Sequence, residues 1–286
     1  MPEMETRAGT VAFEGRGSGV PVVLLHATLH DRHDFDAIAP ALRRDHRVIA
    51  VDWPGCGESP APGSPERLSA PLLADALEDL VEQLELPPAV FIGNSVGGFA
   101  AARLAITHPE RVAGLVLVNT GGFIPINPLV RGFCRLIGTP AIARRVLPSF
   151  VRSYMKPRTE LDREIVARVV ARAKTREGIE MAAALWRSFS ADEHDLRGRA
   201  ERLRAPTLIV WGEKDTAIPL RASRAAHAAI AGSRLEVIET GHVAFSSAPE
   251  EFLALVEPFI QLAAHSAPAA AVASDDGGTS RASGRR

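Results

Sequence analysis

The stretch 89–103, Ala-Val-Phe-Ile-Gly-Asn-Ser-Val-Gly-Gly-Phe-Ala-Ala-Ala-Arg, constrains the fold of this chain more than any other. Its first four residues form an apolar run that is typical of a buried strand, and the small residues from Phe99 onward favour a helix. The chain must therefore turn sharply between Gly93 and Gly98. Glycines on both sides of Ser95 let neighbouring backbone pass close to such a turn, which brings the serine hydroxyl into the open. The competing interpretation is an ordinary glycine turn in which Ser95 caps the helix.

Strands and helices alternate on both sides of this turn. Short apolar runs predict strands at 11–14, 21–25, 47–51, 112–118, 206–211 and 235–239. Apolar residues at helical spacing predict helices at 34–42, 70–86, 219–230 and 249–262. This alternation predicts an α/β fold with a mostly parallel, doubly wound sheet and helices on both faces. Ligands of such sheets bind beyond the carboxyl ends of the strands. The polar residues at or just after these ends are His26, Asp52, Ser95, Asn119, Asp215 and His242.

The alternation stops between residues 121 and 203. Four helical stretches follow one another there, at 129–137, 141–147, 161–175 and 179–188. We expect residues 122–203 to form an all-helical lid inserted into a core domain of residues 8–121 and 204–264. Residues 265–286 consist mainly of Ala, Ser, Gly, Asp and Arg without periodicity, which predicts a disordered tail.

Charge is distributed unevenly along the chain. The formal net charge is −1, which gives no overall reason to expect nucleic acid or a membrane surface as a partner. Residues 123–204, however, hold 17 Lys and Arg against 9 Asp and Glu, a net charge of +8. Solvated helix faces account for this excess. A sharper interpretation is that one of a group of arginines steers an anionic substrate or an acidic carrier toward the site. That group is Arg131, Arg135, Arg144, Arg145 and Arg152.

Several sequence signals that would indicate a secreted protein, a membrane protein or a bound cofactor are missing. The amino terminus has acidic residues and no apolar core, so it does not resemble a secretory signal. No run approaches the ~18 apolar residues of a membrane-spanning helix. Two cysteines, Cys56 and Cys134, are too few for a disulfide framework. We therefore expect a cytoplasmic protein. No metal-ligand spacing and no phosphate-binding glycine motif is found, so neither a metal nor another cofactor is expected.

A serine nucleophile requires a base to take its proton and a third group to hold that base. Asp215 follows a predicted strand and is our candidate for the third group, with Glu213 as the second choice. His242 follows the next predicted strand and is our candidate for the base. The order Ser95, Asp215, His242 is the chain order that one particular sheet architecture imposes on such triads.

At this point the chain resembles serine members of the α/β-hydrolase superfamily with a helical lid, over about residues 8–264. The motifs that carry the resemblance are the loop Asp-Trp-Pro-Gly-Cys-Gly-Glu-Ser at 52–59, Gly-Glu-Lys-Asp at 212–215 and Gly-His at 241–242. The resemblance implies an oxyanion hole formed by the backbone N–H groups of Val96 and Thr28. Two positions depart from the family pattern. Ala27 stands where glycine is usual, and Cys56 stands where histidine is common, with a packing role expected for the thiol.

We expect a cofactor-free serine hydrolase that cleaves a carboxylic ester of a small to medium acyl substrate. Ser95 would attack the carbonyl, His242 would transfer the proton and Asp215 would orient His242. The elbow at 93–98 also resembles that of carbon–carbon bond hydrolases of diketone acids, although Val243 stands where that branch often has tryptophan. Acyl transfer by the same residues, or a non-catalytic ligand-binding role, would also fit these motifs. The sequence does not determine the oligomeric state.

Overall fold

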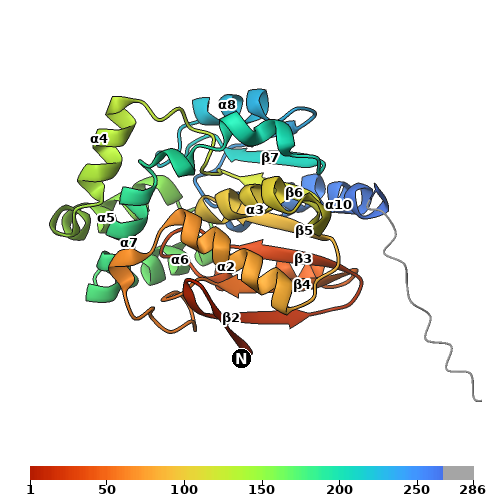
Figure 1. The fold of residues 1–286 in the computed structure, drawn as a ribbon, viewed down its shortest axis with the longest axis horizontal. Helices are drawn as coiled ribbons and strands as arrows, with labels where there is room; N and C mark the ends of the chain where they lie inside the picture. Colours follow the sequence, from red (N-terminus) through yellow and green to blue (C-terminus); the bar gives the residue numbers. More distant parts are fainter. Residues whose placement is uncertain (267–286) are drawn as a thin grey trace, which may run out of the picture.

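The computed structural model describes residues 1–266, which contain one eight-stranded sheet (Figure 1). The strands are β1 (Glu3–Thr6), β2 (Gly9–Arg16), β3 (Val20–Leu25), β4 (His46–Asp52), β5 (Ala89–Asn94), β6 (Val112–Val118), β7 (Thr207–Gly212) and β8 (Arg234–Ile238). Their order across the sheet is β1-β2-β4-β3-β5-β6-β7-β8. Strands β3 to β8 run parallel, while β2 is antiparallel to β1 and β4. The predicted α/β class with a mostly parallel sheet is confirmed.

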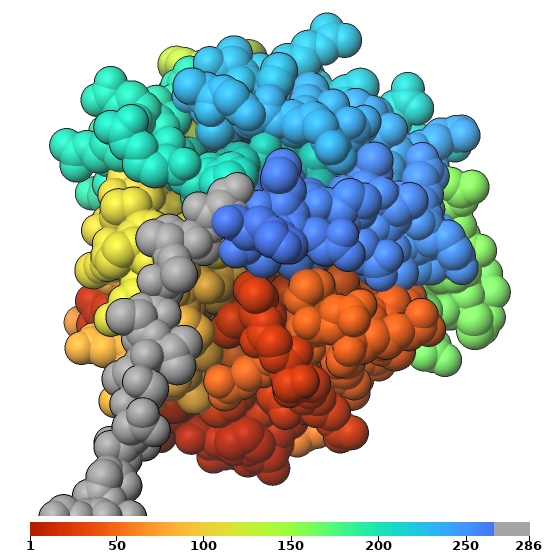
Figure 2. Space-filling model, turned by 90° about the vertical axis from the view of Figure 1, so that its right-hand side faces the viewer, coloured from red at the N-terminus to blue at the C-terminus, as the bar shows by residue number. Residues whose placement is uncertain are grey.

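The inner strands are apolar throughout because both faces of the sheet are covered. Val23 and Leu25 of β3 belong to one hydrophobic cluster, whereas Val22 and Leu24 belong to the other. This alternation follows from the two-residue period of a strand. The first cluster includes residues of α2 (Ala70–Gln83), α3 (Val96–Thr107) and α8 (Arg221–Ala229). The second includes residues of α1 (Ala39–Leu42) and α10 (Pro249–Ser266). Seen from the side, α10 in blue fills the centre of the face (Figure 2).

The helix predicted over 34–42 is not continuous. The structure has a 3₁₀ helix, η1 (Arg32–Phe35), followed by the four-residue α1. Asp31 caps η1 by accepting a hydrogen bond from the His33 N–H, which favours a tight local turn over a longer helix. Pro40 at the start of α1 has no N–H to continue a helix that began earlier.

Four helices lie between β6 and β7, in the region where the sequence predicts a lid. They are α4 (Pro128–Ile137), α5 (Pro140–Met155), α6 (Glu160–Arg172) and α7 (Arg176–Ser188). The 3₁₀ helices η4 (Asp192–His194) and η5 (Arg197–Arg202) lead back to β7. These helices lie on the left of Figure 1, beside one end of the sheet. The predicted tail lies, from residue 267 onward, outside the described residues.

At Gly212, the last residue of β7, the sheet packs closely against the loop that contains Gly241. A Cβ at this position would overlap the carbonyl oxygen of Gly241, whereas a Cβ at Gly15 would have no neighbour within 4 Å. We predict that Gly212→Ala lowers the free energy of unfolding by about 1–3 kcal/mol or more, measured by urea denaturation. Gly15→Ala is the matched control and should be neutral or slightly stabilising. Equal stability of the two variants would contradict this packing.

Candidate active site

The turn between β5 and α3 holds Ser95 in a strained conformation. Ser95 has φ 54° and ψ −113°, backbone angles that residues other than glycine rarely adopt. A Cβ at Gly97 would overlap the carbonyl oxygen of Leu25, so only glycine fits there. The Ser95 N–H donates to the Val118 carbonyl oxygen at 3.1 Å, which ties the turn to β6. The Ser95 side chain makes no capping hydrogen bond to α3, so ordinary helix capping does not describe this turn.

His242 and Asp215 form a hydrogen-bonded pair. His242 Nδ1 lies 2.6 Å from Asp215 Oδ2, and both side chains are buried. The other carboxylate oxygen of Asp215 accepts a hydrogen bond from the Ala217 N–H at 2.7 Å. With Nδ1–H donating to the carboxylate, Nε2 of a neutral His242 is left without a proton and can accept one. Glu213, the second choice for the acid, is exposed.

Asn119 holds Asp215 in place, a role that the sequence did not reveal. Asn119 Nδ2 donates to Asp215 Oδ2 at 2.7 Å, and Asn119 Oδ1 accepts a hydrogen bond from the Gly212 N–H at 2.9 Å. The residue has φ 42°, a left-handed conformation that Asn tolerates better than most residues. Its place directly after an apolar strand was the available signal, but its partner is 96 residues away.

A cavity of about 360 Å³ joins these residues. Ser95, Val96, Thr28 and His242 line it, together with apolar side chains from the helical insertion. Val96 is the first residue of α3, where the N–H has no partner within its own helix, and among the loop and turn hydrogen bonds of residues 1–266 none has the N–H of Val96 or Thr28 as donor. Ala27 is buried and has no positive φ, so alanine fits where the family usually has glycine.

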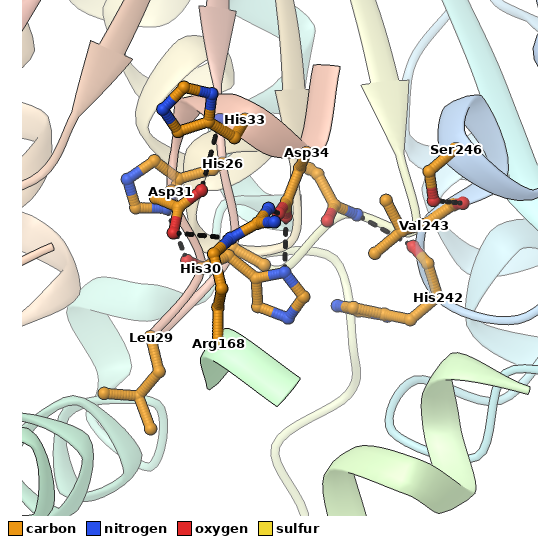
Figure 3. A network of polar contacts seen from close by, with 12 residues as sticks. His26, Leu29, His30, Asp31, His33, Asp34, Arg168, His242, Val243 and Ser246 are labelled. Carbon is orange, nitrogen blue, oxygen red and sulfur yellow. Dashed lines mark hydrogen bonds and ion pairs between the residues drawn. The ribbon is translucent and has the colours of Figure 1, made fainter. Parts of the chain in front are cut away.

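A second histidine–aspartate pair, His30 with Asp34, is shown in Figure 3 and contacts Tyr154, a residue that lines the cavity. His30 Nδ1 is hydrogen-bonded to Asp34, and His30 Nε2 lies 2.9 Å from the Tyr154 hydroxyl oxygen. The Tyr154 ring meets the His242 ring edge-on at 5.1 Å, and the Tyr154 carbonyl oxygen accepts a hydrogen bond from the His242 N–H at 3.0 Å. Burial raises the pKa of Tyr154, so its hydroxyl stays protonated. Tyr154 of α5 thus contacts His242 through both its ring and its backbone.

Two arginines of α6 bind the carboxylates at the carboxyl end of β3. Figure 3 shows Arg168 reaching toward Asp31 and Asp34, at 3.2 and 3.4 Å. Arg172 also pairs with Asp31, at 3.2 Å. Burial alone would raise the pKa of Asp31, but nearby cations, chiefly Arg168, outweigh burial and lower this pKa to about 2. Asp31 is therefore ionised at neutral pH and holds α6 against the core.

The insertion is also bonded to the loop that carries His242. Asp162 of α6 is fully buried and accepts hydrogen bonds from Ser246 Oγ at 2.6 Å and Ser247 Oγ at 3.0 Å. Arg158 donates to the Glu239 carbonyl oxygen at 2.6 Å. The junction of α5 and α6 is therefore fixed to the segment 239–247 that positions His242.

His194 is a further buried residue of the cavity that the sequence did not single out. Its ring lies 4.7 Å from the ring of Phe99 and 4.9 Å from that of Phe189, and its Nε2 has no hydrogen-bond partner among the described residues. Burial lowers the pKa of His194 from 6.5 to about 4. The side chain is therefore neutral at physiological pH.

Several residues that the sequence singled out lie away from the cavity. The five arginines Arg131, Arg135, Arg144, Arg145 and Arg152 do not line it, whereas Arg221 of α8 does. Cys56 is buried, as the expected packing role requires. Burial raises the pKa of its thiol to about 12. Within residues 1–266, no three His, Cys, Asp or Glu side chains are placed to share a metal ion. In the same range, no helix is long and apolar enough to cross a membrane.

These features define a class of protein. A mostly parallel sheet, a serine at a strained strand-to-helix turn, and an acid and a histidine after later strands are the architecture of enzymes with the α/β-hydrolase fold.

Comparison with known proteins agrees with this class. The family model of the alpha/beta hydrolase fold matches residues 20–249, and the chain belongs to this family. A pimeloyl-[acyl-carrier protein] methyl ester esterase of Aeromonas hydrophila is 30% identical over 267 residues, which cover 88% of this chain and 99% of that protein. An uncharacterised protein of Mycobacterium tuberculosis is 28% identical over 272 residues, or 87% of this chain and 77% of that protein.

Solved structures extend the comparison. A thermophilic esterase from Thermogutta terrifontis superposes with a TM-score of 0.75 at 28% identity, covering 92% of this chain and 98% of the esterase. The family and its esterase members identify this chain as an enzyme, a hydrolase that acts on esters.

Asn119→Gly removes the side chain that holds Asp215 and keeps a residue suited to φ 42°. We predict that kcat/KM for an ester falls by about tenfold to a hundredfold, because a hydrogen bond to a buried charged group is lost. Asn119→Ala should show the same loss of activity with a further loss of stability, since alanine is strained at this φ. Full activity in a folded Asn119→Gly protein would exclude a role for Asn119 in positioning Asp215.

The lowered pKa of His194 predicts a pH-dependent stability. Below about pH 6.5 the unfolded chain binds a proton at His194, while the folded protein does so only near pH 4. His194 therefore lowers the free energy of unfolding as the pH falls through this window, by about 3 kcal/mol for the full shift. We compare the free energy of unfolding of His194→Phe with that of the original protein. The difference, variant minus original, should be larger at pH 4 than at pH 7 by about that amount. If urea denaturation gives the same difference in free energy of unfolding between the two proteins at pH 7 and at pH 4, the prediction is contradicted.

Proposed function

We propose that this protein is a serine hydrolase that cleaves carboxylic esters through Ser95, His242 and Asp215. The observation that carries the proposal is the 2.6 Å bond between His242 Nδ1 and Asp215, with Ser95 and His242 lining one cavity. The strained turn at Ser95 supports the role of nucleophile, because it presents a side chain that makes no structural hydrogen bond to α3.

The proposed reaction has the following steps. Ser95 Oγ attacks the ester carbonyl carbon while its proton passes to His242 Nε2, and Asp215 stabilises the imidazolium that forms. The N–H groups of Val96 and Thr28 bind the oxyanion, and by analogy with other oxyanion holes each donor is worth ~3–4 kcal/mol. His242 then gives its proton to the departing alcohol, which leaves an acyl group on Ser95. Water activated by His242 releases the acid and restores the serine.

The cavity supports a small to medium acyl substrate. Its walls carry Phe133, Phe150, Trp186 and Phe189, which suit an apolar chain. Within residues 1–266, Arg221 is the one Asp, Glu, Lys or Arg among its lining residues, so an anionic group of the substrate would find one cation there. We further propose that residues 122–203 act as a lid on a core of residues 8–121 and 204–264, and that the enzyme is cytoplasmic.

Labelling with a fluorophosphonate probe tests the nucleophile. We predict that the protein is labelled once, that Ser95→Ala is not labelled, and that both show the same thermal unfolding. Asp215→Asn should retain the fold and lose about ten-thousandfold in kcat, because an asparagine favours the wrong tautomer of the histidine. Labelling of the Ser95→Ala protein at the same rate would place the nucleophile elsewhere.

A substrate panel distinguishes ester hydrolysis from carbon–carbon bond cleavage and from simple binding. We predict that nitrophenyl esters are hydrolysed and that kcat/KM rises with acyl length until the chain fills a cavity of about 360 Å³. A vinylogous diketone acid serves as the comparison substrate. Cleavage of the diketone acid without cleavage of any ester would favour a carbon–carbon bond hydrolase. Binding without turnover of either would favour a ligand-binding role.

A further inference from the structure

Helices α4 and α5 expose large apolar side chains. In residues 1–266, four exposed side chains of this kind lie on these two helices, while Met1, Val237 and Leu262 lie elsewhere. The four are Leu129 (84% exposed), Leu136 (52%), Phe133 (45%) and Val146 (37%). Positions 129, 133 and 136 share one face of α4 because they are four and three residues apart. Figure 1 places α4 at the outer edge of the insertion, away from the sheet. We call these four residues the α4–α5 patch.

The α4–α5 patch is continuous with the active-site cavity. Leu129 and Phe133 are exposed to solvent and also line the cavity that contains Ser95. An apolar molecule at the patch therefore meets apolar surface from the outside of the protein to the reacting serine. Exposed apolar surface of this kind marks a binding surface more often than a chance feature.

The charged residues of α4 and α5 have one sign. Residues 128–155, which span both helices, contain five arginines and no Asp or Glu. Arg135, Arg144 and Arg145 are exposed, and none of the three has a side-chain hydrogen bond or ion pair with another described residue. In contrast, Arg131 pairs with Asp192 and Arg163 of α6 pairs with Glu160. Helices α4 and α5 thus carry exposed arginines without a side-chain partner as well as exposed apolar side chains.

We propose that the α4–α5 patch docks on the surface of an anionic lipid bilayer. The apolar side chains would enter the boundary between headgroups and acyl chains, and the free arginines would contact phosphate groups, as in interfacial amphipathic helices. A second copy of this chain is a poorer occupant, because a two-fold contact would bring the same arginines face to face. An acidic protein would also pair with the arginines, and failure to bind the mixed vesicles described below would favour it over a bilayer. The net charge of −1 gave no sign of this surface, since it averages a basic insertion with an acidic core.

Docking would bring the mouth of the cavity to the bilayer, so that an ester dissolved in lipid could reach Ser95 without crossing water. This last step rests on the proposed function, whereas docking itself does not. The two are therefore tested separately, with binding measured on the Ser95→Ala protein.

Co-sedimentation with vesicles tests the proposal. The probes are vesicles of phosphatidylcholine alone and vesicles of phosphatidylcholine mixed with phosphatidylglycerol. We expect the Ser95→Ala protein to bind the mixed vesicles and to bind phosphatidylcholine weakly. Adding Arg144→Gln and Arg145→Gln should weaken binding to the mixed vesicles about tenfold or more, because each arginine near an anionic surface contributes to the attraction. Adding Leu136→Ser and Val146→Ser should weaken binding to both kinds of vesicle.

Matched controls separate the patch from general effects. Arg44→Gln with Arg47→Gln removes two exposed arginines far from α4 in the sequence, and Val237→Ser removes an exposed apolar side chain of β8. Neither should change vesicle binding. In the protein with Ser95 intact, the substitutions at 136, 144, 145 and 146 should leave hydrolysis of a short water-soluble ester unchanged, because none of these residues lines the cavity.

Three results would overturn the proposal. The first is no binding to mixed vesicles by a folded protein, and the second is equal weakening by the control substitutions. The third is a stable dimer in sedimentation velocity that Leu136→Ser with Val146→Ser dissociates, which would assign the patch to a second copy. Vesicle binding by a protein that hydrolyses no ester would keep the docking surface and reject the proposed function.

Discussion

The backbone strain at Ser95 is the constraint on which the rest of the site depends. A residue at φ 54° and ψ −113° costs about 1–3 kcal/mol and persists only where its surroundings fix it. Here the turn is fixed by close packing of Gly97 against β3 and by the hydrogen bond from the Ser95 N–H to β6. The strain is thus offset by the sheet itself. A rigid serine in turn requires that the acid and the base come from loops of the same sheet edge.

The helical insertion is bonded to the active site more firmly at one end than at the other. The junction of α5 and α6 contacts the His242 segment through Tyr154, Arg158 and Asp162, and α6 binds the β3 loop through Arg168. Within the part of the chain that the structure describes, helix α4 has no comparable polar contact with the core, and it exposes apolar side chains. Helices α5 and α6 thus hold His242 in position, whereas α4 provides part of the outer wall of the cavity.

Local patterns predicted the sheet and the three candidate site residues. The strand, glycine turn and helix around Ser95 are contiguous, and Asp215 and His242 each follow an apolar strand, so short windows of sequence contain the signal. The roles of Asn119 and His194 arise from contacts between distant segments, which no window contains. Strand β1 was missed because Glu-Met-Glu-Thr is a short polar edge strand. The prediction of one helix over 34–42 was wrong, because capping by Asp31 and the position of Pro40 outweighed the helical spacing of the apolar residues.

In the proposed mechanism, Ser95 carries the acyl group during turnover. Mass spectrometry of the protein, quenched in acid while it hydrolyses a nitrophenyl ester, measures this directly. We predict that the mass of one acyl group is added to the protein and that fragmentation of the peptide containing residues 89–103 places it on Ser95. An acyl group on another residue, or continued hydrolysis with no acylated protein at any time, would contradict the account.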